Sequence, residues 1–245
     1  MAEEVDFSTI DATAMNTDAL KAAVTRALVA GETSITVTLA ADAPVEMFTA
    51  IRRAICDTEG VADGSINLTL KGVTAIPNSS EDDPIFAESY INGSYENVTQ
   101  LASVNLPHVQ TIGEYAFYGC GSLSSLYAPM VKTIEVEAFR GTGLTFLELS
   151  QATTIANGAF TACTALTTVK LPKANYIGDF AFESCEKLTK LELTAEDEIF
   201  FSIAEGYNEE FTNVDLVLHK NKENLVTNGV NWKSVTFKSI TFVGE

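Results

Sequence analysis

The chain has 245 residues, of which 33 are acidic and 15 are basic, so its formal charge is −18. A negative field of this size repels phosphate groups, and we therefore expect neither nucleic acid nor an anionic lipid surface as a partner. No stretch approaches the roughly 18 consecutive apolar residues that a membrane-spanning helix needs, so we expect no membrane insertion.

The N-terminal stretch, residues 1–76, predicts helices that alternate with strands. The expected elements are helices over residues 17–30 and 44–56 and strands over residues 34–39 and 66–70. In the second helix the apolar residues share one face, which places Arg52 and Arg53 on the outward side. We interpret this stretch as a cap made of wide turns that continue into the repeats downstream, and a separate βα domain is the alternative.

Residues 77–99 predict a polar loop insertion. The run Glu81-Asp82-Asp83 offers hard oxygen ligands of the kind that calcium prefers, but it lacks the alternating ligand spacing of a known calcium loop. We therefore expect a solvated acidic loop and no metal site.

Beyond this loop one line of sequence recurs: Ile, often Gly, two variable residues, Ala, Phe, two variable residues and Cys. Copies begin at residues 112, 155 and 177, and a degraded copy with Thr142 in the cysteine place begins at residue 134, so that successive copies are 22, 21 and 22 residues apart. A fixed period of this length with leucines in register indicates a solenoid in which each repeat forms one turn of a stacked coil. The phenylalanines of the four copies should then stack as one buried spine: Phe117, Phe139, Phe160 and Phe182.

Each turn also carries a Leu-x-x-Leu-x-Leu line, whose alternating end predicts a short strand with one buried face. These lines begin at Leu101, Leu123, Leu144, Leu166 and Leu188. Stacking places their strands in one parallel sheet, and the Ile-x-x-x-Ala-Phe line fits a short helical turn on the opposite side. Cys120, Cys163 and Cys185 share one place in the repeat, where we expect small buried side chains; a Cys163–Cys185 disulfide is the alternative.

The pattern Leu-x-x-Leu-x-Leu-Pro followed by Ile-Gly-x-x-Ala-Phe-x-x-Cys, over residues 101–193, resembles the BspA-like, treponemal-type leucine-rich repeat. The resemblance implies an α/β fold, namely a right-handed leucine-rich-repeat solenoid with a parallel β-sheet, a helical N-terminal region and a C-terminal cap. We expect repeats over residues 100–195 and capping turns over residues 196–245. The stretch from Leu216 to Trp232 resembles the closing segment of such proteins: a strand, a lysine-rich turn, a short helix and a tryptophan, before a final strand.

The outward positions of the predicted sheet form the candidate partner-binding face. In the Leu-x-x-Leu-x-Leu line the third and fifth residues point away from the core, and Tyr127 and Phe146 are the aromatic residues among them. We expect their rings to touch on the open face as a binding hot spot, while packing within the sheet or cover by a loop is the alternative. The other members of this face form a ladder of alternating charge, for which local ion pairing is the alternative role: Glu148, Lys170, Lys190 and Glu192.

The sequence contains no pattern that points to catalysis or to a cofactor. The two histidines, His108 and His219, lie too far apart along the solenoid to act together, and the common metalloprotease, hydrolase and phosphate-binding motifs do not occur. We therefore expect no enzymatic activity, no cofactor and no metal.

The resemblance implies a non-enzymatic cell-surface or secreted protein that binds a protein or glycan partner in an adhesion-like role. The alternative is a structural or accessory repeat module without a free ligand, which packs on another domain or assembles with itself; we expect a monomer. The first residues lack the basic region and apolar run of a secretion signal, which fits either a cytoplasmic protein or a mature form without its leader.

Overall fold

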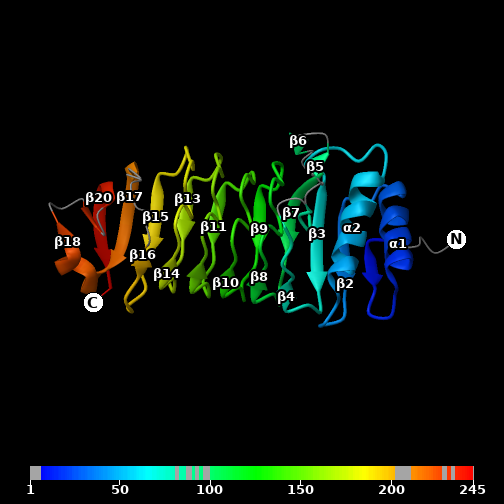
Figure 1. Cartoon of the computed structure of the whole chain (residues 1–245), viewed down its shortest axis with the longest axis horizontal. Helices are drawn as coiled ribbons and strands as arrows, with labels where there is room; N and C mark the ends of the chain where they lie inside the picture. The colour runs from blue at the N-terminus through cyan, green and yellow to red at the C-terminus, as the bar shows by residue number, and fades with distance from the viewer. Residues whose placement is uncertain are drawn as a thin grey trace, which may run out of the picture.

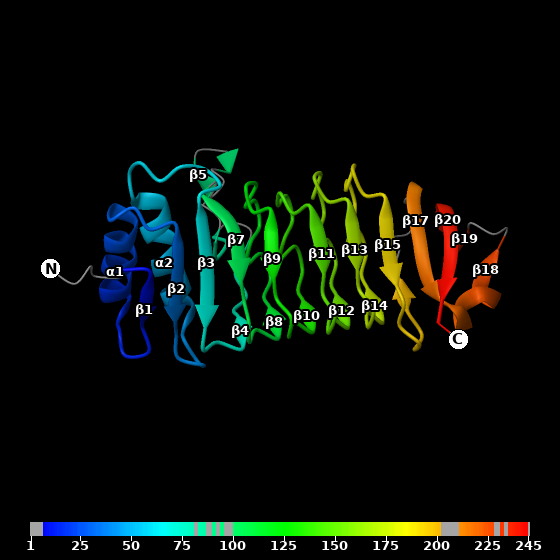
Figure 2. The same cartoon turned by 180° about the vertical axis from the view of Figure 1, so that it is seen from behind.

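The structure is a computed structural model, and it describes residues 7–80, 83–86, 90–91, 94–95, 100–201, 211–227, 231–232 and 235–244. Strands lie side by side along the long axis, from α1 (Thr17–Val29) at one end to β18 (Val226–Thr227) at the other (Figures 1 and 2). Neighbouring strands from successive turns pair in parallel, as a stacked coil requires. The chain is therefore an α/β repeat solenoid, as the sequence predicts.

Two parallel sheets follow one another on the main side of the coil. The first has the order β1-β2-β3-β7-β9, with strands Thr9–Asp11, Ser34–Thr38, Ile66–Lys71, Leu101–Asn105 and Ser125–Tyr127. The second begins β11-β13-β15-β17-β20, with strands Phe146–Glu148, Thr168–Lys170, Lys190–Leu193, Phe211–His219 and Val235–Val243, and ends with β19 (Asn231–Trp232) and β18. The strands of the N-terminal stretch thus share a sheet with those of the first repeats. Between β9 and β11 the strand ladder is interrupted, and the Thr145 amide donates to the Ser124 carbonyl at 3.4 Å.

Another parallel sheet forms on the return side of the coil, from the start of each Ile-x-x-x-Ala-Phe line. Its order is β16-β14-β12-β10-β8-β4, with strands Phe200–Phe201, Tyr176–Ile177, Thr154–Ile155, Thr133–Ile134, Thr111–Ile112 and Ala75–Ile76. A separate antiparallel pair joins β5 (Tyr90–Ile91) to β6 (Ser94–Tyr95).

The short helical turn predicted for this line does not form. After each two-residue strand the backbone enters the left-handed region, at Tyr115 (φ 55°), Glu137 (φ 52°) and Phe180 (φ 58°), and again four residues later at Gly119 and Ser184. A right-handed helix cannot pass through these φ values, so the line continues as a series of turns.

The predicted phenylalanine spine is confirmed. Ring centroids are 5.1 Å apart between Phe117 and Phe139, 5.4 Å between Phe139 and Phe160, and 5.7 Å between Phe160 and Phe182, with planes within 8° of parallel. All four side chains are buried. The spine extends one ring beyond the prediction, because Phe86 stacks on Phe117 at 5.0 Å.

The segment predicted as a loop insertion therefore supplies part of the core. Ile85 and Phe86 are buried, and the Phe86 amide donates to the Ala116 carbonyl as a turn of the coil would. Phe86 also meets Phe48 of α2 (Val45–Asp57) edge to face, which connects the spine to the N-terminal helices. Glu81 and Asp82, candidates for a calcium loop, lie outside the described residues.

The sequence prediction for Arg52, which placed this residue on the outward side of its helix, is wrong. Its side chain is only 6% exposed and donates from Nη1 to Asp83 Oδ1 at 2.8 Å and to the Pro84 carbonyl, whereas Arg53 is exposed. The cause is the 83–86 segment, which packs over this side of α2 and provides the polar partners that a buried guanidinium needs.

The repeat cysteines are free thiols, so the Cys163–Cys185 disulfide does not form. Each thiol donates instead to the carbonyl of a spine phenylalanine of the preceding turn: Cys120 to Phe86 at 3.0 Å, Cys163 to Phe139 at 3.1 Å and Cys185 to Phe160 at 3.2 Å. In the degraded copy Thr142 occupies the same place in the repeat, but its hydroxyl donates to the Phe139 carbonyl of its own turn, at 2.9 Å. This place in the repeat therefore favours a small side chain with one hydrogen-bond donor.

The ends of the coil are closed by helices. At the N-terminal end α1 begins with the amide of Ala19 donating to Asn16 Oδ1 at 2.9 Å. At the C-terminal end the 3₁₀ helix η1 (Lys220–Leu225) follows β17, and the ammonium of Lys222 donates to the Glu196 carbonyl at 2.6 Å. The order strand, lysine-rich turn and short helix agrees with the sequence analysis, and the side chain of Trp232 lies outside the described residues.

Candidate partner-binding face

The main sheets present two columns of outward side chains, because alternate residues of each strand point to opposite sides. In the second sheet one column is Phe146, Thr168, Lys190 and Asp215, and the other is Glu148, Lys170, Glu192 and Val217. The residues between them, such as Leu147, Val169 and Leu191, are at most 1% exposed. The strand register predicted from the leucine lines is therefore the register of the structure.

Tyr127 and Phe146 are large and exposed, at 60% and 45% of their surface. They flank the interruption between the two main sheets, since Tyr127 ends β9 and Phe146 begins β11. The predicted contact between their rings is not found among the ring contacts of the described residues. The Phe146 ring instead has the Lys170 ammonium over it, 5.4 Å from the centroid.

The four charged side chains of this face are engaged in pairs, which is the alternative role considered for them in the sequence analysis. Lys170 Nζ lies 3.6 Å from Glu148 Oε2, and Lys190 Nζ lies 2.6 Å from Glu192 Oε1. Exposed pairs of this kind contribute little to stability, typically below about 1 kcal/mol. They leave this part of the face locally neutral, although the whole chain carries −18.

One further carboxylate ends this charged part of the face. Asp215 accepts from the Ser239 hydroxyl at 2.6 Å and from Lys238 Nζ at 3.1 Å. These hydrogen bonds, with that from Ser239 the stronger effect, hold the pKa of Asp215 below its ordinary value. The group is therefore ionised at neutral pH.

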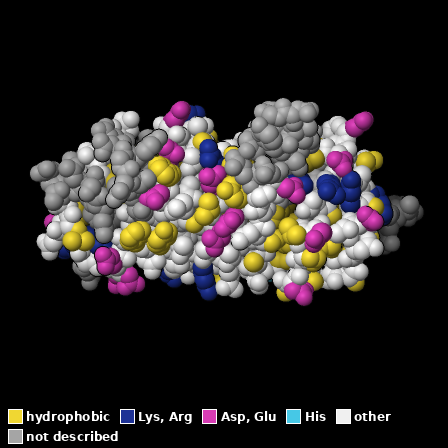
Figure 3. All heavy atoms as spheres, viewed as in Figure 1, with side chains coloured by type: hydrophobic (Ala, Val, Ile, Leu, Met, Phe, Trp, Pro, Cys, Tyr) yellow, Lys and Arg dark blue, Asp and Glu magenta, His cyan; other side chains and the backbone are white. Residues whose placement is uncertain are grey.

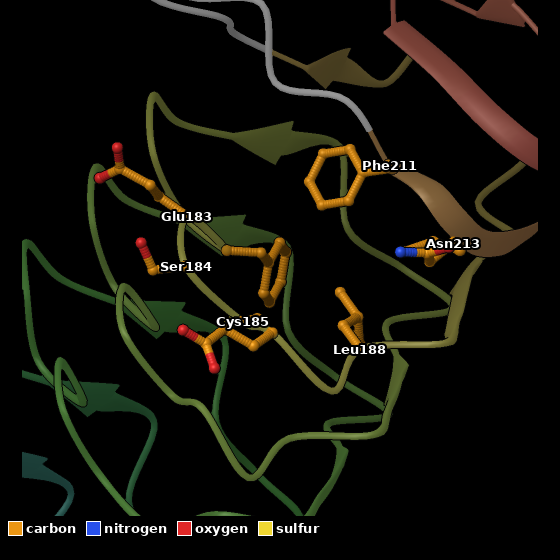
Figure 4. A pocket seen from close by; sticks show the side chains of 9 residues that line it. Glu183, Ser184, Cys185, Leu188, Phe211 and Asn213 are labelled. Atoms are coloured by element: carbon orange, nitrogen blue, oxygen red, sulfur yellow. The ribbon is translucent and has the colours of Figure 1, made fainter.

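A hollow of about 290 Å³ lies nearer the C-terminal end, between the last spine phenylalanine and β17 (Figure 4). Phe182, Leu188 and Phe211 line it with apolar surface, and Asn213 stands at its side (Figure 4). Among the described residues no ring contact joins Phe182 to Phe211, and Phe211 stacks instead on Phe237 at 5.5 Å.

The described residues show no arrangement suited to catalysis or to metal binding. No group of three or more His, Cys, Asp or Glu side chains among them could hold a metal ion. Burial raises the pKa of the Cys163 thiol to about 11 and that of Cys120 further still, so both thiols are protonated at neutral pH and are poor nucleophiles. His219 accepts from the Asn221 amide, and His108 lies in a different part of the coil.

The sequence analysis did not identify two exposed aromatic residues on the return side. Tyr176 and Phe200 are 37% and 54% exposed and occupy the outward column of the β14–β16 sheet. A signal was present, since Tyr176 stands directly before the repeat isoleucine, where earlier copies have threonine.

The coil, its parallel sheets and its open outward columns define a repeat solenoid of the leucine-rich type. A family model for the BspA-type leucine-rich repeat region matches the chain in 6 copies over residues 89–215, which is more than half of its length. The chain therefore belongs to that family, as the sequence resemblance predicts.

Repeats of this family form protein-interaction modules and are generally not enzymes. No curated protein and no solved structure matches the chain. Within the described residues, no helix combines the length and the apolar character that crossing a membrane requires.

Proposed function

We propose that this chain is a non-enzymatic recognition protein, displayed on a cell surface or secreted, that binds a protein or glycan partner through the main side of its solenoid. The observation that carries the proposal is the exposure of Tyr127 and Phe146 on neighbouring turns, in columns whose other exposed members are polar or charged. Exposed aromatic side chains are enriched among the residues that dominate binding energy.

The surroundings of the two rings support a binding role. Lys170 covers Phe146 from one side and is itself paired with Glu148, so the aromatic surface is bordered by charges that are already neutralised. A partner can then cover the rings without leaving an unpaired buried charge, which would weaken binding. The arrangement is that of an apolar centre with a polar rim.

The test is a binding screen of the intact chain against purified extracellular proteins and a glycan array, with matched variants. Tyr127→Ser and Phe146→Thr introduce residue types that already occupy these columns at Ser125 and Thr168. We expect the pair of substitutions to weaken binding by tenfold or more, because hot-spot truncations cost more than about 1.4 kcal/mol. Met130→Ser, at another exposed apolar side chain, is the control.

The outcomes separate recognition from packing. If the rings stabilise the sheet instead, the two substitutions will lower the free energy of unfolding by more than about 1 kcal/mol. The folded variant will then bind a partner with the same affinity as the unmodified chain. Sedimentation at increasing protein concentration tests the alternative of self-assembly: association that the two substitutions leave unchanged would count against a partner-binding role for this face.

A further inference from the structure

The return sheet has an outward column that changes character along the coil. Thr111, Thr133 and Thr154 lie beside one another in register, and the column then continues with Tyr176 and Phe200. A hydrophobic patch is visible over β14 and β16 (Figure 3). Threonine therefore occupies this outward position on three successive turns, whereas the last two turns place exposed aromatic rings there.

The two rings stack on each other but leave surface open. Their centroids are 5.1 Å apart and their planes differ by 8°. Phe200 is nonetheless 54% exposed, and its strand β16 is the last of this sheet in the described part of the chain. Tyr176 covers one face of the Phe200 ring, and more than half of the Phe200 side chain remains exposed.

The loop beside this ring is acidic, and two basic side chains contact its first acidic residue. Lys222 Nζ donates to the Glu196 carbonyl at 2.6 Å, and His219 Nε2 lies 4.0 Å from Glu196 Oε1. The loop that leads into β16 carries Glu196, Asp197 and Glu198, all exposed, and ends directly before Ile199 and Phe200. Figure 3 shows acidic side chains at the same end of the hydrophobic patch. The nearest basic residue before Tyr176 in sequence is Lys173, whose ammonium already donates to Gln151 Oε1 at 2.7 Å.

We propose that Tyr176 and Phe200, with the acidic loop 196–198, form a second docking surface, and that it takes an arginine-bearing segment of a partner protein. A guanidinium is weakly hydrated, stacks on an aromatic face and pairs with carboxylates, so one side chain satisfies both halves of this surface. The overall charge of −18 steers a basic segment towards it. This surface is on another side of the solenoid from Tyr127 and Phe146, so it stands or falls separately from the proposed function.

The experiment uses fluorescently labelled peptides of alternating arginine and glycine, with lysine–glycine and glutamate–glycine peptides for comparison, and fluorescence anisotropy on the whole chain. We expect the arginine peptide to bind more tightly than the lysine peptide and the glutamate peptide not to bind. Tyr176→Thr and Phe200→Thr restore the residue of the earlier turns, and each is expected to weaken binding of the arginine peptide by roughly two- to fivefold. Phe146→Thr, on the main side, is the matched control and is expected to change nothing.

Equal binding by wild type and by the two threonine variants would show that the overall negative charge alone attracts the peptide, and would overturn the proposal. So would equal affinity for arginine and lysine peptides, or an equal loss in Phe146→Thr. Phe200→Leu serves if a threonine variant does not fold, because leucine keeps apolar volume and removes the aromatic face. A loss of arginine binding in this folded variant supports the proposal, and retained binding refutes it.

Discussion

Replacing Phe160 by alanine is the most direct test of the spine on which the coil is built. The ring is fully buried and stacked on both sides, 5.4 Å from Phe139 and 5.7 Å from Phe182. A buried phenylalanine removes about 150–250 Å² from water, which at roughly 25 cal/mol per Å² corresponds to about 4–6 kcal/mol as an upper estimate. Measured costs of such truncations are roughly 3–5 kcal/mol, and we expect about 4 kcal/mol here, because the two rings that stack on Phe160 are themselves buried.

The assay is urea unfolding followed by circular dichroism, with Phe146→Ala as the control. Phe146 lies on the open face and is 45% exposed, so its truncation should cost less than about 1 kcal/mol. Each turn contacts only its neighbours, so a weakened turn in mid-coil should also broaden the transition or split it in two. A loss below about 1 kcal/mol for Phe160→Ala, or one equal to that of Phe146→Ala, would refute the idea that stacked rings hold the turns together.

Three further predictions follow from individual side chains. Ala162→Gly should stabilise the chain by roughly 0.5–1 kcal/mol in thermal unfolding, because Ala162 has φ 59°, whereas Ala165→Gly, outside the left-handed region, should destabilise it. Arg52→Ala should lower the free energy of unfolding by about 2–4 kcal/mol in urea, because the buried Pro84 carbonyl loses its hydrogen-bond donor. The control, Arg53→Ala, should cost less than about 0.5 kcal/mol because Arg53 is exposed, and similar costs for the two variants would contradict the buried position of Arg52. Because the pKa of Cys163 is raised in the folded chain, the unfolded chain loses the thiol proton at lower pH, and the free energy of unfolding should fall as the pH rises from about 9 to about 11. Cys163→Ala should show a shallower fall over this window. Parallel curves for the two proteins would contradict burial of the thiol.

The repeat pattern was sufficient to predict the features that depend on period alone. Identical residues 21 or 22 places apart fall on the same column of a coil, which is why the stacking of Phe117 to Phe182 and the exposure of Tyr127 and Phe146 could be predicted. The pair Lys170–Glu148 joins neighbouring turns through the same register, whereas Lys190 and Glu192 pair within one strand.

The irregular segments could not be predicted in this way. Phe86 lies in a stretch without the repeat motif, and only packing shows that it continues the spine and buries Arg52. The contact partner of Phe146 also required the structure, because neighbouring columns allow either Tyr127 or Lys170 to reach the ring, and the sequence does not fix side-chain directions.

The sequence by itself determined the solenoid, its family, the inward and outward sides of its main strands and the absence of recognisable catalytic motifs, since all of these follow from a local pattern repeated along the chain. The tertiary structure decided what covers the N-terminal end of the spine, which polar groups are buried, and that a pair of stacked rings on the return side, Tyr176 and Phe200, is exposed beside an acidic loop. These properties arise from contacts between turns, where the geometry of the backbone and the shape of neighbouring side chains determine which surfaces are covered and which remain exposed.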